Sequence, residues 1–293
     1  MSKISSLIES LIKDYSSQQR GFVQTHVPRV QVFWTREYLP REPLVYEPGI
    51  MILGQGHKIG YLGPREFVYD PDTCLVVGAP IPFECESYAT PEEPLLGLRI
   101  DIDLALLHAI VTKMSGEFDF VEDLSGAYSA VEPSRMEPDL IAATERLLTC
   151  LQNPESSMIL GEARVTEVIY QVLLGEKGKV LHGLTQQNTQ YGCIANALAK
   201  IHKDYDQALC VEELARNSAM STSAFHRAFK SVTGNSPMQY LKRIRLDKAR
   251  GLLLHHNFQV NTAAYQVGYE SPSQFSREFK RLFNVSPSEL KAG

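Results

Sequence analysis

Two stretches of the sequence, STSAFHRAFKSVTGNSP at residues 221–237 and SPSQFSREFKRLFNVSP at residues 271–287, repeat one another at an offset of fifty residues. Each has two Phe four positions apart, an Arg between them, a Lys after the second Phe and a Ser-Pro at its end. Because residues four apart share one face of a helix, the Phe pairs predict amphipathic helices. Gly234 and Asn284 follow these helices and suit the positive φ that ends one.

Each copy is preceded by a shorter segment with small residues, VEELARNSA at 211–219 and NTAAYQVGY at 261–269. A short helix, a tight turn and a second amphipathic helix predict a helix-turn-helix motif. Solvated faces carry similar residues, but two copies in register favour base reading, where Arg can bind guanine in bidentate fashion. The outward residues of the second helices, and hence the predicted base contacts, are Ser223, His226, Arg227, Ser273, Ser276 and Arg277.

The connector SPMQYLKRIRLDKARGLLLHH, residues 236–256, predicts one long helix between the two copies. Such a helix spans about 25–30 Å, comparable to the roughly 34 Å between successive major-groove faces of a duplex. It could therefore hold both second helices on one side of DNA. The side chains that we expect to contact phosphates are Lys230, Lys242, Arg243 and Lys280.

Charge is unevenly distributed along the chain. Residues 191–293 hold fourteen Lys and Arg against eight Asp and Glu, a net +6, so a whole-chain charge of −5 leaves −11 for residues 1–190. This favours a polyanionic partner for the C-terminal third alone. The composition, 44% hydrophobic and 22% charged, is typical of a globular protein. Without a secretory signal or an apolar stretch of membrane-spanning length, we expect a cytoplasmic protein with no membrane partner.

The first part of the chain changes character once. From about residue 21 to 103, short apolar runs are broken every eight to twelve residues by Pro, Gly or Asp, which predicts a small antiparallel β sandwich or barrel. Amphipathic stretches at 104–114, 138–153 and 161–178 then predict helices. The polar segment HGLTQQNTQYG, residues 182–192, is the predicted linker, and it divides the chain into domains at 1–185 and 186–293.

Residues from about 194 to 290 resemble the DNA-binding domain of the AraC/XylS family of bacterial transcription regulators. SPMQYLKRIRLDKARGLL and VGYESPSQFSREFKRLFNVSP carry the resemblance in the family's order and spacing. The family's usual Gly after the final Phe is Asn284 here. The resemblance places the same six residues at base-reading positions.

The N-terminal half, including PGIMILGQGHKIGYLG and VVGAPIPFECESYATPEEPLLGLRIDID, resembles the cupin-like sensor half of one branch of this family. The resemblance implies an α+β chain, a cupin-like β barrel with flanking helices followed by an all-α domain of two helix-turn-helix motifs. It also implies effector sensing and dimerisation. The expected partners are promoter DNA, an unknown small-molecule effector and a second copy of the chain, with RNA polymerase as a further candidate.

The sequence contains little that indicates a metal or cofactor site. A cupin metal site uses paired His, but His57 has no His-x-His partner, and Ile59 occupies the third glycine position of a dinucleotide loop in LGQGHKIG. The five Cys form no C-x-x-C pair, which favours reduced thiols. Cys85 lies between two Glu in the sequence, which argues against a low thiol pKa. We therefore expect no cofactor, no metal and no catalytic residue.

The candidates for effector binding are His57, Tyr61 and Arg99, polar or aromatic residues on predicted strands or turns of the barrel. For each of them the sequence favours an ordinary surface or core residue over a ligand contact. The leading interpretation is a DNA-binding regulator of the AraC type that responds to an effector. Two alternatives stay open: a metal-dependent cupin enzyme with an appended DNA-binding domain, and an architectural DNA binder without a ligand.

Overall fold

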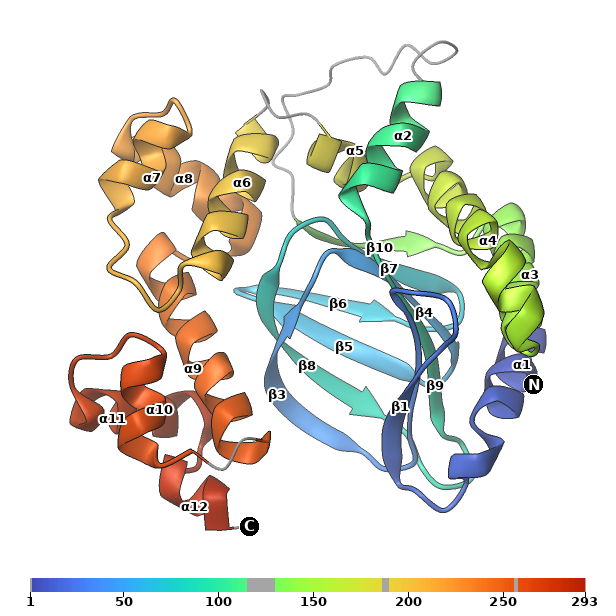
Figure 1. The fold of residues 1–293 in the computed structure, drawn as a ribbon, viewed down its shortest axis with the longest axis horizontal. Helices are drawn as coiled ribbons and strands as arrows, with labels where there is room; N and C mark the ends of the chain where they lie inside the picture. Colours follow the sequence, from blue (N-terminus) through green and yellow to red (C-terminus); the bar gives the residue numbers. More distant parts are fainter. Residues whose placement is uncertain (1, 115–129, 186–189, 256–257, 293) are drawn as a thin grey trace.

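The computed structural model describes residues 2–114, 130–185, 190–255 and 258–292. Within these ranges, the first part of the chain forms a β domain flanked by helices, and the last part forms a run of helices beside it (Figure 1). The α+β class expected from the sequence is therefore confirmed.

The β domain consists of two facing antiparallel sheets. The six-stranded sheet has the spatial order β1 (Arg20–Gln24), β2 (Val30–Thr35), β9 (Leu95–Asp101), β4 (Gly49–Gln55), β7 (Thr73–Val77) and β10 (Val131–Arg135). The four-stranded sheet has the order β3 (Leu39–Tyr46), β8 (Ile81–Tyr88), β5 (His57–Leu62) and β6 (Arg65–Tyr69). Strands β1 to β9 occupy the region, about residues 21–103, for which the sequence predicts strands. The sequence VEPSR of β10 was not predicted, because a single Val and a Pro give no strand pattern.

Alternation along β9 divides its side chains between two cores. Leu96, Leu98 and Ile100 point to the helices that cover the six-stranded sheet, whereas Leu95 points between the sheets. The covering helices are α1 (Lys3–Leu11), which continues into the 3-10 helix Lys13–Tyr15, then α2 (Leu104–Met114), α3 (Pro138–Leu151), α4 (Pro154–Leu174) and α5 (Lys179–Thr185). The helices predicted at 104–114, 138–153 and 161–178 are confirmed as α2, α3 and α4, although α4 begins earlier than predicted, at Pro154.

Local signals set the ends of α4. Asn153 caps the N-terminus by accepting a hydrogen bond from the backbone N–H of Ser156, and Pro154 occupies the first turn, where it loses no helical bond. The helix ends at Leu174, and Gly175 is its C-cap. Part of the predicted linker is helical, however, because α5 extends to Thr185 with Val180 and Leu181 buried. Residues 186–189 of that linker lie outside the described residues.

The C-terminal helices lie on the opposite side of the β domain from α1, α3 and α4 (Figure 1). They are α6 (Gln190–Lys203), α7 (Val211–Asn217), α8 (Thr222–Thr233), α9 (Pro237–His255), α10 (Val260–Gln266), α11 (Pro272–Phe283) and α12 (Pro287–Ala292). One hydrophobic cluster runs from Tyr69 and Phe83, between the sheets, to Ile194 on α6 and Phe225 on α8. The second motif has a separate cluster built around Phe275 and Phe279.

Candidate nucleic-acid interface

The two repeats form two helix-turn-helix units, α7 with α8 and α10 with α11. Ser221 and Ser271 cap the second helix of each unit by accepting hydrogen bonds from the backbone N–H groups of Ala224 and Gln274. The helices end at Gly234 and Asn284, with φ of 71° and 61°. Both left-handed residues predicted from the sequence are thus confirmed, and the two units have matching starts and stops.

The Phe pairs fill the interior of each unit. Phe225 and Phe229 have ring centroids 5.6 Å apart, Phe275 and Phe279 have centroids 5.4 Å apart, and all four side chains are fully buried. Because the Phe pair occupies the buried face of each helix, the side chains on the opposite face point to solvent. The exposed ones are Ser223, His226, Arg227 and Lys230 on α8, and Ser273, Arg277 and Lys280 on α11, with Ser276 half-buried.

The long helix α9 runs between the units (Figure 1), and its Lys242 is tied to the second of them. Lys242 Nζ donates to Glu278 Oε1 at 2.9 Å, and the same carboxylate accepts from Gln274 Nε2 and from the Tyr269 hydroxyl. Burial alone would raise the pKa of Glu278, but these hydrogen bonds hold it below its ordinary value. Lys242, which the sequence offers as a phosphate contact, therefore has a protein carboxylate as its partner in this structure.

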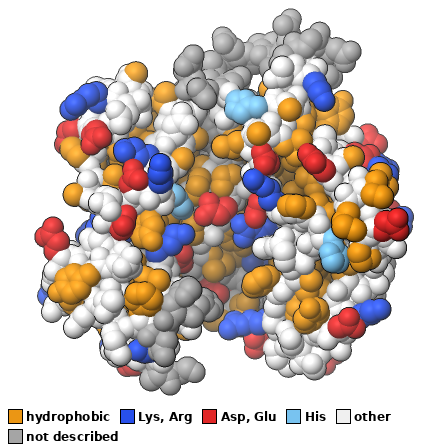
Figure 2. Space-filling model, in the orientation of Figure 1, with side chains coloured by type: hydrophobic (Ala, Val, Ile, Leu, Met, Phe, Trp, Pro, Cys, Tyr) orange, Lys and Arg blue, Asp and Glu red, His pale blue; other side chains and the backbone are white. Residues whose placement is uncertain are grey.

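Two other cations of α9, Arg243 and Arg250, point toward the β domain. Arg243 Nη2 lies 3.6 Å from Glu84 Oε1 of β8, and burial lowers the pKa of its guanidinium. Arg250 Nη2 donates to Glu42 Oε2 of β3 at 3.0 Å. Acidic and basic side chains accordingly gather in the hollow between the two lobes of the molecule (Figure 2). Arg243 thus lies against the β domain and not on the face that carries Arg227.

Hydrogen bonds join the first unit to the β domain on the side away from the reading face. The Tyr240 hydroxyl of α9 donates to the Pro80 carbonyl, and the Ala130 backbone N–H donates to the Val232 carbonyl at 3.3 Å. His202 Nε2 lies 2.6 Å from the Tyr240 oxygen, and burial lowers the pKa of His202 to about 4, which leaves the ring neutral at physiological pH. The docked β domain leaves both predicted reading faces exposed.

Arg245 on α9, to which the sequence analysis assigns no role, joins two segments of the C-terminal part. Its guanidinium donates to the carbonyls of Tyr205 at 2.7 Å, Gln207 at 2.8 Å and Gly268 at 2.9 Å. Gly268 has φ of 83°, and a Cβ there would fall 2.4 Å from the Asp206 carbonyl oxygen. Arg245 therefore clamps the loop after α6 onto the turn of the second unit. A run of basic residues alone gives no signal that distinguishes this clamp from a phosphate contact.

The three effector candidates do not come together in the structure. His57 and Tyr61 are on the outer face of the four-stranded sheet, where His57 stacks on Tyr88 and the Tyr61 hydroxyl donates to Glu86 at 2.9 Å. Arg99 belongs to the other sheet and donates to Asp101 at 2.6 Å. Within the described residues, no group of three His, Cys, Asp or Glu is arranged to hold a metal ion. None of the described helices is long and apolar enough to cross a membrane.

Two protein-family models match this chain. The model of the AraC-type transcriptional regulator N-terminus matches residues 26–180, and that of a helix-turn-helix domain matches residues 214–293. The chain belongs to the AraC-type transcriptional regulators. The resemblance seen in the sequence is therefore confirmed for both halves.

Curated relatives of this AraC-type chain include the HTH-type transcriptional activator RhaS of Salmonella schwarzengrund and of Salmonella paratyphi A. Each is 27% identical over 161 residues, which cover 54% of this chain and 57% of the relative. The chain thus matches little more than half the length of these relatives.

Among solved structures, two forms of ToxT from Vibrio cholerae have the same fold. An apo lysine-to-alanine variant has a TM-score of 0.60 at 14% identity, covering 92% of this chain and 99% of that one. The unsaturated fatty acid-bound wild type has a TM-score of 0.57 at 14% identity, covering 92% and 94%. At this identity the likeness concerns the fold, and it extends over both halves of the chain.

Proposed function

We propose that this AraC-type chain binds duplex DNA sequence-specifically and regulates transcription, with residues 186–293 reading DNA and residues 1–185 controlling that activity. The observation that carries the proposal is the pair of exposed helix faces on α8 and α11, each with Ser, Arg and Lys at the same positions. The faces are built identically, from a Ser cap to a left-handed C-terminal residue. Activation of transcription, the role in the name of RhaS, is the expected mode.

Arg227→Ala is expected to weaken specific DNA binding by about 1–3 kcal/mol and to relax base preference in one half of the site. Arg227 is exposed on α8, and none of the ion pairs between described residues includes it. Its guanidinium is free to bond the O6 and N7 atoms of a guanine. Binding-site selection from a random duplex library, followed by titration of the selected site, measures both effects.

Arg135→Ala is the matched control, because Arg135 is an exposed Arg of the β domain, away from both units. The control should leave affinity and preference unchanged. If Arg227→Ala behaves like this control, the first unit does not read bases through Arg227, and the assignment of the reading face is wrong.

We further propose that the β domain senses a small-molecule effector. The fold neighbour ToxT has been solved with an unsaturated fatty acid bound, which supports a ligand-responsive domain of this fold. Native mass spectrometry of the purified chain would detect a co-purified organic molecule or a metal. Bound metal would favour the metal-dependent cupin enzyme, whereas DNA affinity that no ligand changes would favour the architectural DNA binder.

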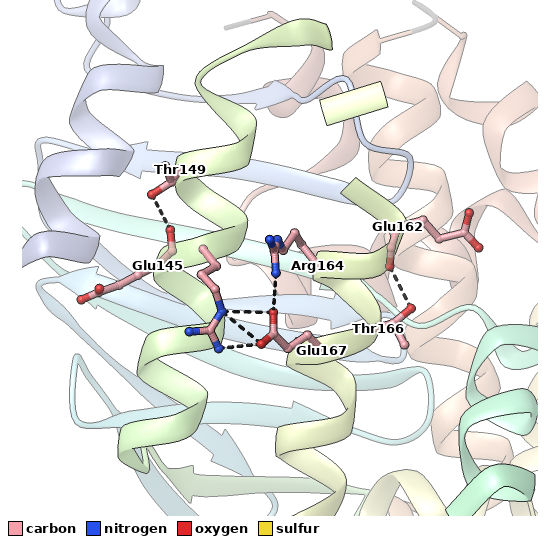
Figure 3. A network of polar contacts seen from close by, with 7 residues as sticks. Glu145, Thr149, Glu162, Arg164, Thr166 and Glu167 are labelled. Atoms are coloured by element: carbon pink, nitrogen blue, oxygen red, sulfur yellow. Dashed lines mark hydrogen bonds and ion pairs between the residues drawn. The ribbon is translucent and has the colours of Figure 1, made fainter. Parts of the chain in front are cut away.

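A second copy of the chain is the proposed partner of the α3–α4 face. Met158 and Ile159 on α4 are 73% and 72% exposed, next to a hollow of about 370 Å³. Its wall combines Ala142 and Leu160 with charged side chains, among them Glu145, Arg146 and Arg164. In a two-fold dimer, the exposed Met158 and Ile159 of each copy can insert into the hollow of the other copy, which is the self-complementary arrangement that such an interface needs. In the wall of this hollow, Arg164 points to Glu167 between the two helices (Figure 3), and Arg146 donates to the same carboxylate.

Ile159→Glu is expected to shift the chain from dimer to monomer, because it would place a carboxylate in the apolar centre of this interface. Sedimentation equilibrium of the full chain at graded concentrations gives the dissociation constant, which should rise at least about tenfold. Leu174→Glu, at the other end of α4 and also exposed, is the control. A monomeric parent chain, or equal effects of both variants, would contradict this interface.

The remaining proposals follow from the family. We expect the chain to act in the cytoplasm, without catalytic activity, and to contact RNA polymerase when it is bound at a promoter. In vitro transcription with purified polymerase would test this, because an activator must raise transcript yield from a template that contains the selected site.

A further inference from the structure

An isolated cation lies between the two sheets. Lys58 on β5 points inward, opposite in direction to its neighbour His57, and the residue is only 8% exposed. Its Nζ donates to the Tyr46 hydroxyl at 3.0 Å. That oxygen lies 3.0 Å from the Tyr69 hydroxyl, which in turn lies 3.4 Å from Cys85 Sγ. These four side chains come from four strands, β3, β5, β6 and β8, and we call them the Lys58 cluster.

Among the residues that the structure describes, no carboxylate pairs with this ammonium. In the described parts of the chain, none of the ion pairs includes Lys58. Burial raises the pKa of Tyr46 and of Tyr69, so both phenols stay neutral. The rings of Phe33 and Tyr46, at 5.9 and 5.7 Å from Nζ, add only cation–π attraction. Within the described residues the cluster is therefore hydrogen-bonded, with the Cys85 sulfur close to the ammonium, but no carboxylate offsets this positive charge in the apolar interior.

A buried charge without a counter-charge lowers the stability of a protein, and an apolar side chain of similar size would lower it less. A ligand that supplies the missing negative charge would recover this energy on binding. We propose that the Lys58 cluster is the anion-binding end of the effector site, and that the effector is a monocarboxylate with an apolar body. This inference rests on the proposed sensing role of the β domain.

The chemistry of the cluster selects this class of ligand. A carboxylate oxygen would replace the Tyr46 hydroxyl as acceptor for Nζ, and the Tyr46 and Tyr69 hydroxyls would then be free to donate to the same group. One ammonium balances one negative charge, so a phosphate dianion is left half-compensated. A sugar needs many polar partners, whereas the side chains around the cluster include the apolar rings of Phe67 and Phe83. A cationic ligand would be repelled.

Phe33 on β2 is the side chain that can rotate to make room for the apolar part of the carboxylate ligand. The tip of its ring covers Gly97, where a Cβ would fall 2.1 Å from Phe33 Cζ. The Phe33 side chain is only partly buried, whereas Phe67 and Phe83 are buried. β1 is the edge strand beside β2, and its Phe22, directly opposite Phe33, is 69% exposed. Rotation of the Phe33 side chain toward this edge would uncover both Gly97 and the Lys58 ammonium.

The test uses the full chain without DNA and a series of straight-chain carboxylates from acetate to decanoate. Hexanamide and hexylammonium are the matched probes: they keep the six-carbon chain of hexanoate but are neutral and positively charged, respectively. Thermal denaturation should show stabilisation by the carboxylates, increasing with chain length as more apolar surface is buried, and none by the two probes. Calorimetric titration gives the affinities.

Lys58→Met should raise the melting temperature of the free chain and weaken hexanoate binding by roughly ten- to a hundredfold. Lys113→Met, at an exposed position on α2, should change neither. A Lys58→Met chain that melts lower than the parent, or that binds hexanoate as the parent does, overturns the proposal. So do equal effects of hexanoate and hexanamide, or no stabilisation by any carboxylate in the series.

Tyr69→Phe keeps the ring and removes one donor, so it tests the cluster even where Lys58→Met fails to fold. It should weaken hexanoate binding severalfold and leave the melting temperature response to hexanamide unchanged, and an unaltered hexanoate affinity counts against the cluster. Titration of the selected DNA site is a separate measurement. A chain that binds hexanoate but no DNA would overturn the regulator and leave the carboxylate site standing.

Discussion

Phe275→Ala is expected to lower the free energy of unfolding of the second helix-turn-helix unit by about 3–5 kcal/mol. Phe275 is fully buried, and its ring centroid lies 5.4 Å from those of Tyr269 and Phe279. The hydrophobic cluster of this unit is small and separate from the other two, so little surrounding structure can collapse into the cavity. Urea unfolding followed by far-ultraviolet circular dichroism should show loss of this unit at lower denaturant concentration.

Ser273→Ala is the informative companion, because Ser273 is exposed on the same helix and is a predicted base contact. It should leave the unfolding curve unchanged and alter DNA binding only. A Phe275→Ala chain with the parent's unfolding curve but without DNA binding would instead make Phe275 a contact residue and reverse the orientation assigned to α11.

The helix-turn-helix units could be predicted from the sequence because their signals are local. The Phe225–Phe229 spacing sets the buried face within one turn, and Gly234 sets the stop, so no long-range information is needed. The repeat then supplied a second, independent copy of the same signals. By contrast, the hydrophobic cluster that joins the first unit to the β domain depends on docking of distant segments, which a local pattern does not encode.

In the β domain, the sequence predicts which side chains share a face of a strand but not which face is buried. Strand alternation predicts that residues 57 and 61 of β5 share a face, but it does not say which face is inside. The structure puts Lys58, Gly60 and Leu62 inside, so the effector candidates on this strand lie on the outer face. The same parity separates Cys85 from the two Glu that flank it in sequence, because alternate side chains of β8 point to opposite faces.

For the basic residues of α9, the sequence predicts the charge of the helix but not the partner of each side chain. A run of Lys and Arg predicts a basic surface, yet the partner of each side chain is set by which segment packs against the helix. In the structure Lys242 meets Glu278 of α11, and Arg243 and Arg250 meet carboxylates of the β domain. Charge patterning alone therefore gave the sign of the C-terminal third but not the role of each cation.

Arg245→Met is expected to lower the free energy of unfolding by about 2–4 kcal/mol, because it leaves three backbone carbonyls without the charged donor that holds them. The expected loss includes specific DNA binding, since the turn of the second unit is no longer fixed to the loop after α6. Thermal denaturation and titration of the selected DNA site measure the two effects on the same preparation.

Arg245→Lys separates the clamp from a phosphate contact. An ammonium keeps the positive charge but lacks the planar fork of five N–H donors, so it cannot reach the carbonyls of Tyr205, Gln207 and Gly268 together. If Arg245 acts as a clamp, the Lys variant should lose nearly as much stability as the Met variant. If Arg245 served DNA through its charge, the Lys variant would keep both the parent's melting temperature and most of its DNA affinity, and the slope of affinity against salt would fall only in the Met variant.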